Sequence, residues 1–156
     1  MDKDRESAKN YAFLLLGYRS RTCFEIATKL RQKGYDSDTI RKVIEKLSEY
    51  NYLNDREFAK LWIRNRCRLK PMGKSRLRQE LMAKGVEKDI IETELAELTD
   101  EEEFNLATQL VERKLAKKQY SRKQMASYLL RRGFSPSIMN KVTQDLTDFN
   151  CQNMGK

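Results

Sequence analysis

A glycine that follows a basic residue and precedes an apolar one occurs three times in this chain, at Gly34, Gly85 and Gly133. The sequence around each glycine repeats. Apolar residues recur four and eight positions before it, and six and thirteen positions after it. The glycines are 51 and 48 residues apart, a period typical of repeat architectures. The chain is therefore predicted to contain three copies of one structural unit.

Each repeat is predicted to form three helices. In the first repeat, Cys23, Ile26, Ala27 and Leu30 have the spacing of one helix face, and Gly34 supplies the C-terminal cap. Similar stripes mark a leading and a third helix. They comprise Ala8, Tyr11, Ala12, Leu15 and Leu16, then Ile40, Val43, Ile44 and Leu47, with leading-helix counterparts at Phe58, Ala59, Trp62 and Ile63 and at Phe104, Ala107 and Val111.

Capping patterns mark several helix starts. No run of alternating apolar and polar residues is long enough to predict a strand. The pairs are Asn54 with Glu57, Thr99 with Glu102, Ser121 with Gln124, and Ser135 before Pro136. We therefore predict an all-α fold of three tandem three-helix repeats, each similar to a helix-turn-helix unit. The predicted repeats span residues 1–53, 54–98 and 99–149, followed by a frayed tail at 150–156.

Composition narrows both the shape and the function. Of 156 residues, 39% are hydrophobic and 35% are charged, which favours an elongated, curved molecule whose repeats stabilise one another. Histidine is absent, which removes the commonest general base and metal ligand. The three cysteines are widely spaced and odd in number, as expected in a reducing cytosol. We predict a non-enzyme without cofactor or metal.

The chain carries no predicted targeting or membrane segment. Its first residues are strongly polar, and the longest apolar run is only Ala12 to Leu16. The expected location is the cytoplasm, and the expected state is a monomer. The formal charge of +9 favours a polyanionic partner, although a solvated basic surface gives the same number.

Positive charge is concentrated between Arg56 and Arg78, where nine basic residues accompany the single acid Glu57. Like charges four residues apart on a helix repel, so an anionic partner explains this stripe better than stability does. Trp62 is predicted to be core, with Arg66 beside it as a possible anchor of the fold. The candidate partner-binding residues are Arg56, Lys60, Arg64, Arg68, Lys70, Lys74, Arg76 and Arg78.

Other charged segments have simpler explanations. The acids Asp100 to Glu103 suit the first turn of a helix, where the macrodipole favours anions. Arginines beside Cys67 are expected to lower the pKa of its thiol, but a catalytic role is not predicted without histidine. A second basic set lies further on, at Lys114, Lys117, Lys118, Arg122, Lys123, Arg131 and Arg132.

The segment from Tyr52 to Ala59, YLNDREFA, resembles the signature of the bacterial RecX family. Trp62 follows, then Lys70-Pro71 with Gly73, and then Leu77, Glu80, Leu81 and Lys84-Gly85-Val86 in the family's order. This resemblance implies tandem three-helix repeats that bind the RecA–DNA filament. It also implies damping of filament growth, ATP hydrolysis, strand exchange and repressor cleavage.

Two other functions remain open at this point. A helix-turn-helix-like unit with a basic stretch is also typical of a module that binds single- or double-stranded DNA directly. A helical scaffold without a nucleic-acid role is the third candidate. Selectivity separates them, because a filament regulator prefers RecA on DNA to DNA alone.

Overall fold

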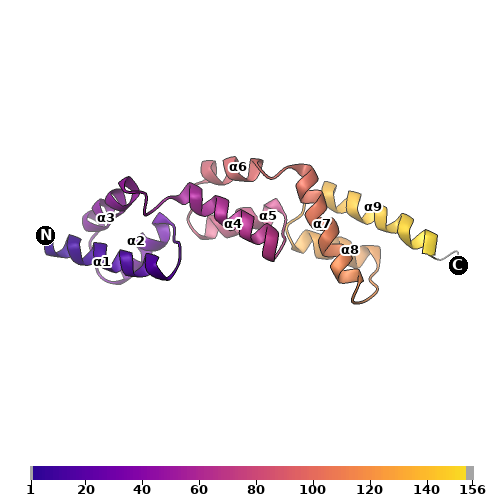
Figure 1. Ribbon diagram of the computed structural model, residues 1–156, viewed down its shortest axis with the longest axis horizontal. Coiled ribbons are helices and arrows are strands. Elements are labelled where there is room, and N and C mark those ends of the chain that lie inside the picture. The colour runs from indigo at the N-terminus through magenta and orange to yellow at the C-terminus, as the bar shows by residue number, and fades with distance from the viewer. Residues whose placement is uncertain (1, 154–156) are drawn as a thin grey trace. The chain divides into compact units, whose positions relative to one another are not determined.

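The computed structural model describes residues 2–153, with side chains for residues 2–144, and this part contains nine α-helices and no strand (Figure 1). The predicted all-α fold is confirmed. The helices are α1 (Asp2–Tyr18), α2 (Cys23–Gln32), α3 (Ser37–Glu49), α4 (Asp55–Leu69), α5 (Lys74–Ala83), α6 (Lys88–Ala96), α7 (Asp100–Leu115), α8 (Arg122–Arg131) and α9 (Pro136–Asn153).

The backbone groups into two compact units. The first unit contains the described residues up to Leu61 together with Leu81–Glu92, and the second contains Trp62–Glu80 together with the residues from Thr93 onward. The predicted repeat borders near residues 54 and 99 come from the spacing of similar residues in the sequence, whereas the compact units come from contacts in space. The division into three repeats stays a prediction, and each compact unit is described by itself below.

The core of the first unit is formed where α1, α2 and α3 pack together (Figure 1). Small residues on α1 let the other two helices approach closely. Ala8 and Ala12 are fully buried against Ile26 of α2 and Leu47 of α3. All four residues belong to the predicted stripes, so the helical periodicity located this core correctly.

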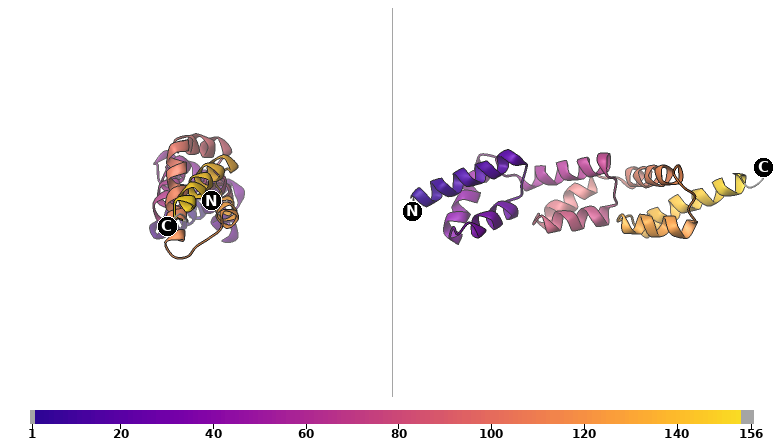
Figure 2. Two further views of the ribbon diagram at one scale, coloured as in Figure 1. Left: turned by 90° about the vertical axis from the view of Figure 1, so that its right-hand side faces the viewer. Right: turned by 90° about the horizontal axis from the view of Figure 1, so that it is seen from below.

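The second unit has an equivalent core between α7, α8 and α9 (Figure 2). Ala107 and Val111 of α7 are buried with Met125 and Leu129 of α8. Ala107 lies 26 residues before Gly133, and Ala8 lies 26 residues before Gly34. The same small residue therefore occupies the same register position in both cores.

The predicted helix caps are present. Thr99 and Ser121 form reciprocal capping boxes with Glu102 and Gln124. At α4, the backbone N–H of Glu57 donates to the side-chain oxygen of Asn54 over 3.1 Å. The Ser135 hydroxyl oxygen accepts from the N–H of Ile138 at the start of α9. A further box that the sequence analysis missed joins Thr22 and Glu25 at α2.

The three glycines of the repeat have the left-handed backbone that their position requires. The φ angles are 101° at Gly34, 78° at Gly85 and 87° at Gly133. L-residues reach this region only at a cost of about 1–2 kcal/mol, whereas glycine reaches it freely. The prediction that Gly34 ends its helix as a left-handed cap is confirmed, and Gly85 and Gly133 have the same backbone.

In the first unit, the start of α2 packs on the turn that contains Gly85. The Thr22 hydroxyl donates to the carbonyl oxygen of Lys84 over 2.5 Å. The backbone N–H of Cys23 donates to the carboxylate of Asp55 over 2.9 Å. A Cβ atom on Gly85 would lie 2.2 Å from Cβ of Phe24, so only glycine fits there.

The second unit contains the same contact between the start of α5 and the turn at Gly133. The backbone N–H of Gly73 donates to the carbonyl oxygen of Arg132 over 2.8 Å. The backbone N–H of Lys74 donates to the carboxylate of Glu103 over 3.2 Å. A Cβ atom on Gly133 would lie 2.4 Å from Cβ of Arg76. We call this arrangement the turn contact in both units.

The predicted frayed tail at residues 150–156 lies only partly within the described residues. Helix α9 extends to Asn153, and the fraying of the tail stays a prediction. Residues 154–156 lie outside the described part of the chain.

The glycine turns give the first prediction. Replacing Gly34 by Ala should cost roughly 1–2 kcal/mol of stability, because only the left-handed backbone is strained. Replacing Gly85 by Ala should cost about 1–3 kcal/mol more, because the added methyl group also meets Phe24. Urea unfolding followed by circular dichroism measures both. Equal losses would show that the turn contact contributes nothing.

Candidate functional site

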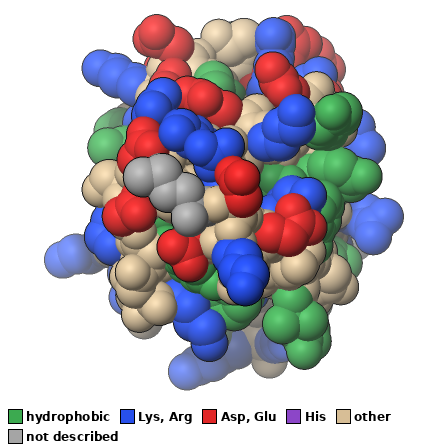
Figure 3. All heavy atoms as spheres, turned by 90° about the vertical axis from the view of Figure 1, so that its left-hand side faces the viewer, with side chains coloured by type: hydrophobic (Ala, Val, Ile, Leu, Met, Phe, Trp, Pro, Cys, Tyr) green, Lys and Arg blue, Asp and Glu red, His purple; other side chains and the backbone are tan. Residues whose placement is uncertain are grey.

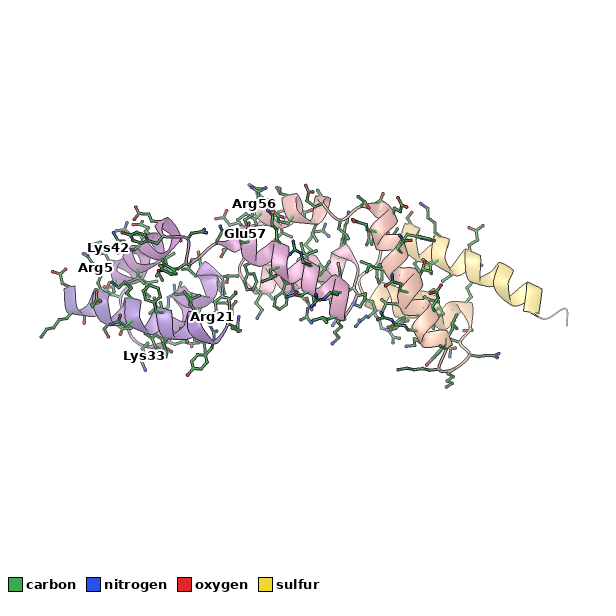
Figure 4. The ribbon with its side chains drawn as sticks, viewed as in Figure 1. Arg5, Arg21, Lys33, Lys42, Arg56 and Glu57 are labelled. Atoms are coloured by element: carbon green, nitrogen blue, oxygen red, sulfur yellow. The ribbon has the colours of Figure 1, made fainter. Side chains whose placement is uncertain are left out.

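The basic stripe of α4 lies on an exposed helix face. Arg56 and Lys60 belong to the first unit, and Arg64 and Arg68 belong to the second. All four are exposed and are spaced four residues apart on one helix. Lys60 lies 3.6 Å from Glu57 in an ion pair. Figure 4 shows Arg56 and Glu57 near the start of α4.

Arg64 and Arg68 are the members of the stripe that the fold does not use. Within residues 2–144, neither guanidinium group forms a hydrogen bond or an ion pair. Lys70, in the turn after α4, is exposed in the same way. These three cations therefore have their full charge available to a partner.

The predicted site residues on α5 are less exposed. Lys74, Arg76 and Arg78 are half-buried. The Arg76 guanidinium donates to the carbonyl oxygen of Arg131 over 3.2 Å, and its backbone packs on Gly133. Arg76 therefore has a structural task in the turn contact of the second unit, a task that the sequence analysis did not foresee.

The opposite side of α4 holds a polar cluster centred on Glu80. The indole N–H of Trp62 and the Nε–H of Arg66 donate to the same carboxylate oxygen, over 2.9 and 3.1 Å. The Arg66 guanidinium also lies 4.7 Å from the centre of the Trp62 ring. Arg66 anchors the fold, as predicted. Trp62 is half-buried, so its assignment to the core was wrong, and its indole N–H is held by the Glu80 carboxylate.

The two described cysteines are free thiols in half-buried positions. Burial raises the pKa of the Cys67 thiol, and the negative charges of Glu102 and Glu103 raise it further. Burial and the charge of Asp55 act in the same direction on the pKa of Cys23. The expectation that arginines lower the pKa of Cys67 was therefore wrong, because burial and two carboxylates raise it.

A second basic surface lies in the second unit between α7 and α8. Lys114 is placed over two rings, with its Nζ atom 3.7 Å from the centre of Tyr128 and 5.1 Å from that of Tyr120. An open pocket of about 360 Å³ adjoins it and contains no acidic lining residue. Its lining residues are Lys114, Tyr120, Lys123, Gln124, Ser127 and Arg131. The pocket suits an anionic group, and the sequence showed the cations but not the cavity.

Acidic side chains accompany the cations on one face of the molecule. Figure 3 shows Lys and Arg interleaved with Asp and Glu on the face turned to the viewer. Asp100 to Glu103 occupy the first turn of α7, as predicted from the macrodipole. Glu103 has a further task, because it is buried and accepts the N–H of Lys74.

Within the described residues, no helix is long and apolar enough to cross a membrane.

Two family models match this chain. Residues 8–47 match the first three-helix domain of RecX, and residues 54–95 match its second three-helix domain. The second match contains the whole of α4 and α5 and so includes every candidate site residue. The fold and the site thus define a protein built from RecX-type three-helix domains.

Curated relatives agree with these matches. The chain is 36% identical over 152 residues to the regulatory protein RecX of Prosthecochloris aestuarii, covering 93% of this chain and 97% of that protein. It is 34% identical over 151 residues to the regulatory protein RecX of a Mycobacterium species (strain JLS), covering 90% and 82%. This chain belongs to the RecX family of regulatory proteins.

Solved structures show the same fold. The crystal structure of RecX from Lactobacillus salivarius matches with a TM-score of 0.85 and 26% sequence identity, covering 94% of this chain and 99% of that one. A second structure, of a regulatory protein RecX, matches with a TM-score of 0.79 and 23% identity, covering 90% and 72%. The resemblance inferred from the sequence is therefore confirmed.

The polar cluster gives the second prediction. Replacing Glu80 by Ala should lower stability by roughly 1–3 kcal/mol, because Trp62 and Arg66 both lose their acceptor. Replacing the exposed Glu87 by Ala removes the same charge and should change stability little. Urea unfolding compares the two variants. If they behave alike, the Glu80 carboxylate does not hold Trp62 in place.

Proposed function

We propose that this protein binds the RecA–DNA filament and inhibits the recombinase, ATPase and co-protease activities of RecA. The observation that carries the proposal is the pair Arg64 and Arg68, exposed and without ion pairs in the described chain, within the matched second RecX domain. The relatives of this chain are named regulatory proteins, which agrees with a regulator that catalyses no reaction itself.

The charge arrangement supports an anionic partner. Arg64 and Arg68 repel each other at their spacing of four residues, by a few tenths of a kcal/mol. The fold offers them no compensating carboxylate among the described residues. A DNA phosphate or a RecA carboxylate would remove this repulsion on binding. The proposed contact set is Arg56, Lys60, Arg64, Arg68, Lys70, Lys74, Arg76 and Arg78.

Direct DNA binding is the second candidate function. The pocket at Lys114, Lys123 and Arg131 favours it, because three cations and an aromatic ring suit a phosphate beside a base. The two functions differ in selectivity, since a filament regulator prefers RecA on DNA to bare single- or double-stranded DNA. As a partner of RecA, the protein is expected to act in the cytoplasm.

The stripe gives the third prediction. The double variant Arg64→Glu with Arg68→Glu should fold normally, because both side chains are exposed, and should lose most inhibition of the DNA-dependent RecA ATPase. Lys117→Glu with Lys118→Glu is the matched control, with the same change in net charge on exposed residues of the second unit. If only this control loses inhibition, the contact lies on the third predicted repeat.

Salt dependence is the fourth prediction. Phosphate contacts release counterions, so the logarithm of the binding constant should fall by about 0.7 per contact for each tenfold rise in salt on single-stranded DNA. If Arg64 and Arg68 both touch phosphates, the double variant should have a slope shallower by about 1.4. Fluorescence anisotropy of labelled RecA–DNA filaments over a salt series measures it. An unchanged slope would show that neither arginine touches a phosphate.

A further inference from the structure

The start of α8 is a third copy of the surface that makes the turn contact at α2 and α5. Thr22, Gly73 and Ser121 each lie twelve residues before the glycine of their own predicted repeat. The next backbone N–H donates to a carboxylate at Cys23 and at Lys74. The equivalent N–H, on Arg122, has no hydrogen-bond partner among the described residues. Among the described residues, nothing occupies this half of the contact.

The other half of the contact, at the first glycine turn, is likewise unoccupied by any described residue. Asp4 lies thirty residues before Gly34, the same separation that places Asp55 before Gly85 and Glu103 before Gly133. The Asp4 carboxylate is exposed and forms no ion pair or hydrogen bond within the described chain. A Cβ atom on Gly34 would meet no described atom within 4 Å, in contrast to Gly85 and Gly133.

We propose that copies of this chain associate head to tail, with the start of α8 of one copy docked on Asp4 and the Gly34 turn of the next. The Arg122 N–H then donates to the Asp4 carboxylate, repeating the contact seen twice within the chain. Arg122 and Lys123 begin α8, whereas the start of α1 alternates Asp2 and Asp4 with Lys3 and Arg5, so the pairing rests on the repeated turn contact and not on net charge. The occupant is a second copy because this chain supplies both halves.

The two surfaces are unlike each other, so the interface is heterologous. One turn contact is small, and the association in free solution is therefore weak. Copies lined up on a shared polymer would meet at a high effective concentration, which strengthens the same contact. The monomer expected from the sequence is then the state at low concentration, and the proposal stands independently of the proposed RecA function.

Two variants test the proposed contact, and each removes one of its two halves. Arg122→Pro removes the N–H donor, and proline is tolerated at the first position of a helix. Ser121, with ψ of 160°, already has the extended backbone required before proline. Asp4→Lys replaces the acceptor carboxylate by a cation. Arg122→Ala and Glu6→Lys are the matched controls, with the same loss of charge at α8 and the same reversal on α1.

Sedimentation equilibrium of the full chain over a concentration series tests the proposal without RecA or DNA. The wild type and both controls should gain mass as concentration rises. Each variant alone should stay monomeric, whereas a mixture of the two should form dimers and nothing larger, since one intact donor and one intact acceptor remain. Circular dichroism verifies folding.

Three results would overturn head-to-tail association: a wild type that stays monomeric up to about 1 mM, variants that associate like the wild type, or a mixture that forms no dimers. A monomeric wild type whose Arg122→Pro variant alone loses RecA inhibition would instead assign the start of α8 to a carboxylate of another protein. Because the sedimentation assay contains no RecA, its failure leaves the proposed function standing.

Discussion

The packing of a helix start on a glycine turn is the contact on which each compact unit depends. Gly85 meets two demands at once, since its positive φ ends α5 and its missing side chain admits Phe24. The N–H groups at the start of a helix have no partner inside the helix. The turn contact satisfies one of them with a carboxylate from another helix, at Cys23 through Asp55. Capping and tertiary packing are thus the same interaction here.

One side of helix α4 contributes to the stability of the fold, and the other side presents exposed positive charge. Trp62 and Arg66 share the Glu80 carboxylate on one side, and this cluster fixes α4 to α5 within the second unit. The exposed side carries Arg64 and Arg68, which the fold does not need. Substitutions on the exposed side can therefore alter binding while the helix stays in place. A single helix can in this way hold a domain together and still present a concentrated charge.

Local features of this structure were predictable, and features that depend on distant residues were not. Capping boxes such as Thr99 with Glu102 involve residues three positions apart, so the sequence alone shows them. Glu103 belongs to the same acidic turn, and the macrodipole explained its presence there. Its hydrogen bond to the N–H of Lys74 spans 29 positions and exists only in the folded chain. The half-burial of Trp62 and the raised pKa of Cys67 have the same origin in tertiary contacts.

The turn contact also explains why the sequence repeat is easy to recognise at the glycine turn and hard to recognise at the helix start. Gly85 and Gly133 must remain glycine, because their backbone and their neighbours exclude a side chain. The helix start contributes a backbone N–H, which any residue except proline provides, so Cys23 and Lys74 serve equally well. The acceptor needs only negative charge, and Asp55 and Glu103 both supply it. A contact between main-chain groups can therefore recur through a chain while most of its side chains differ.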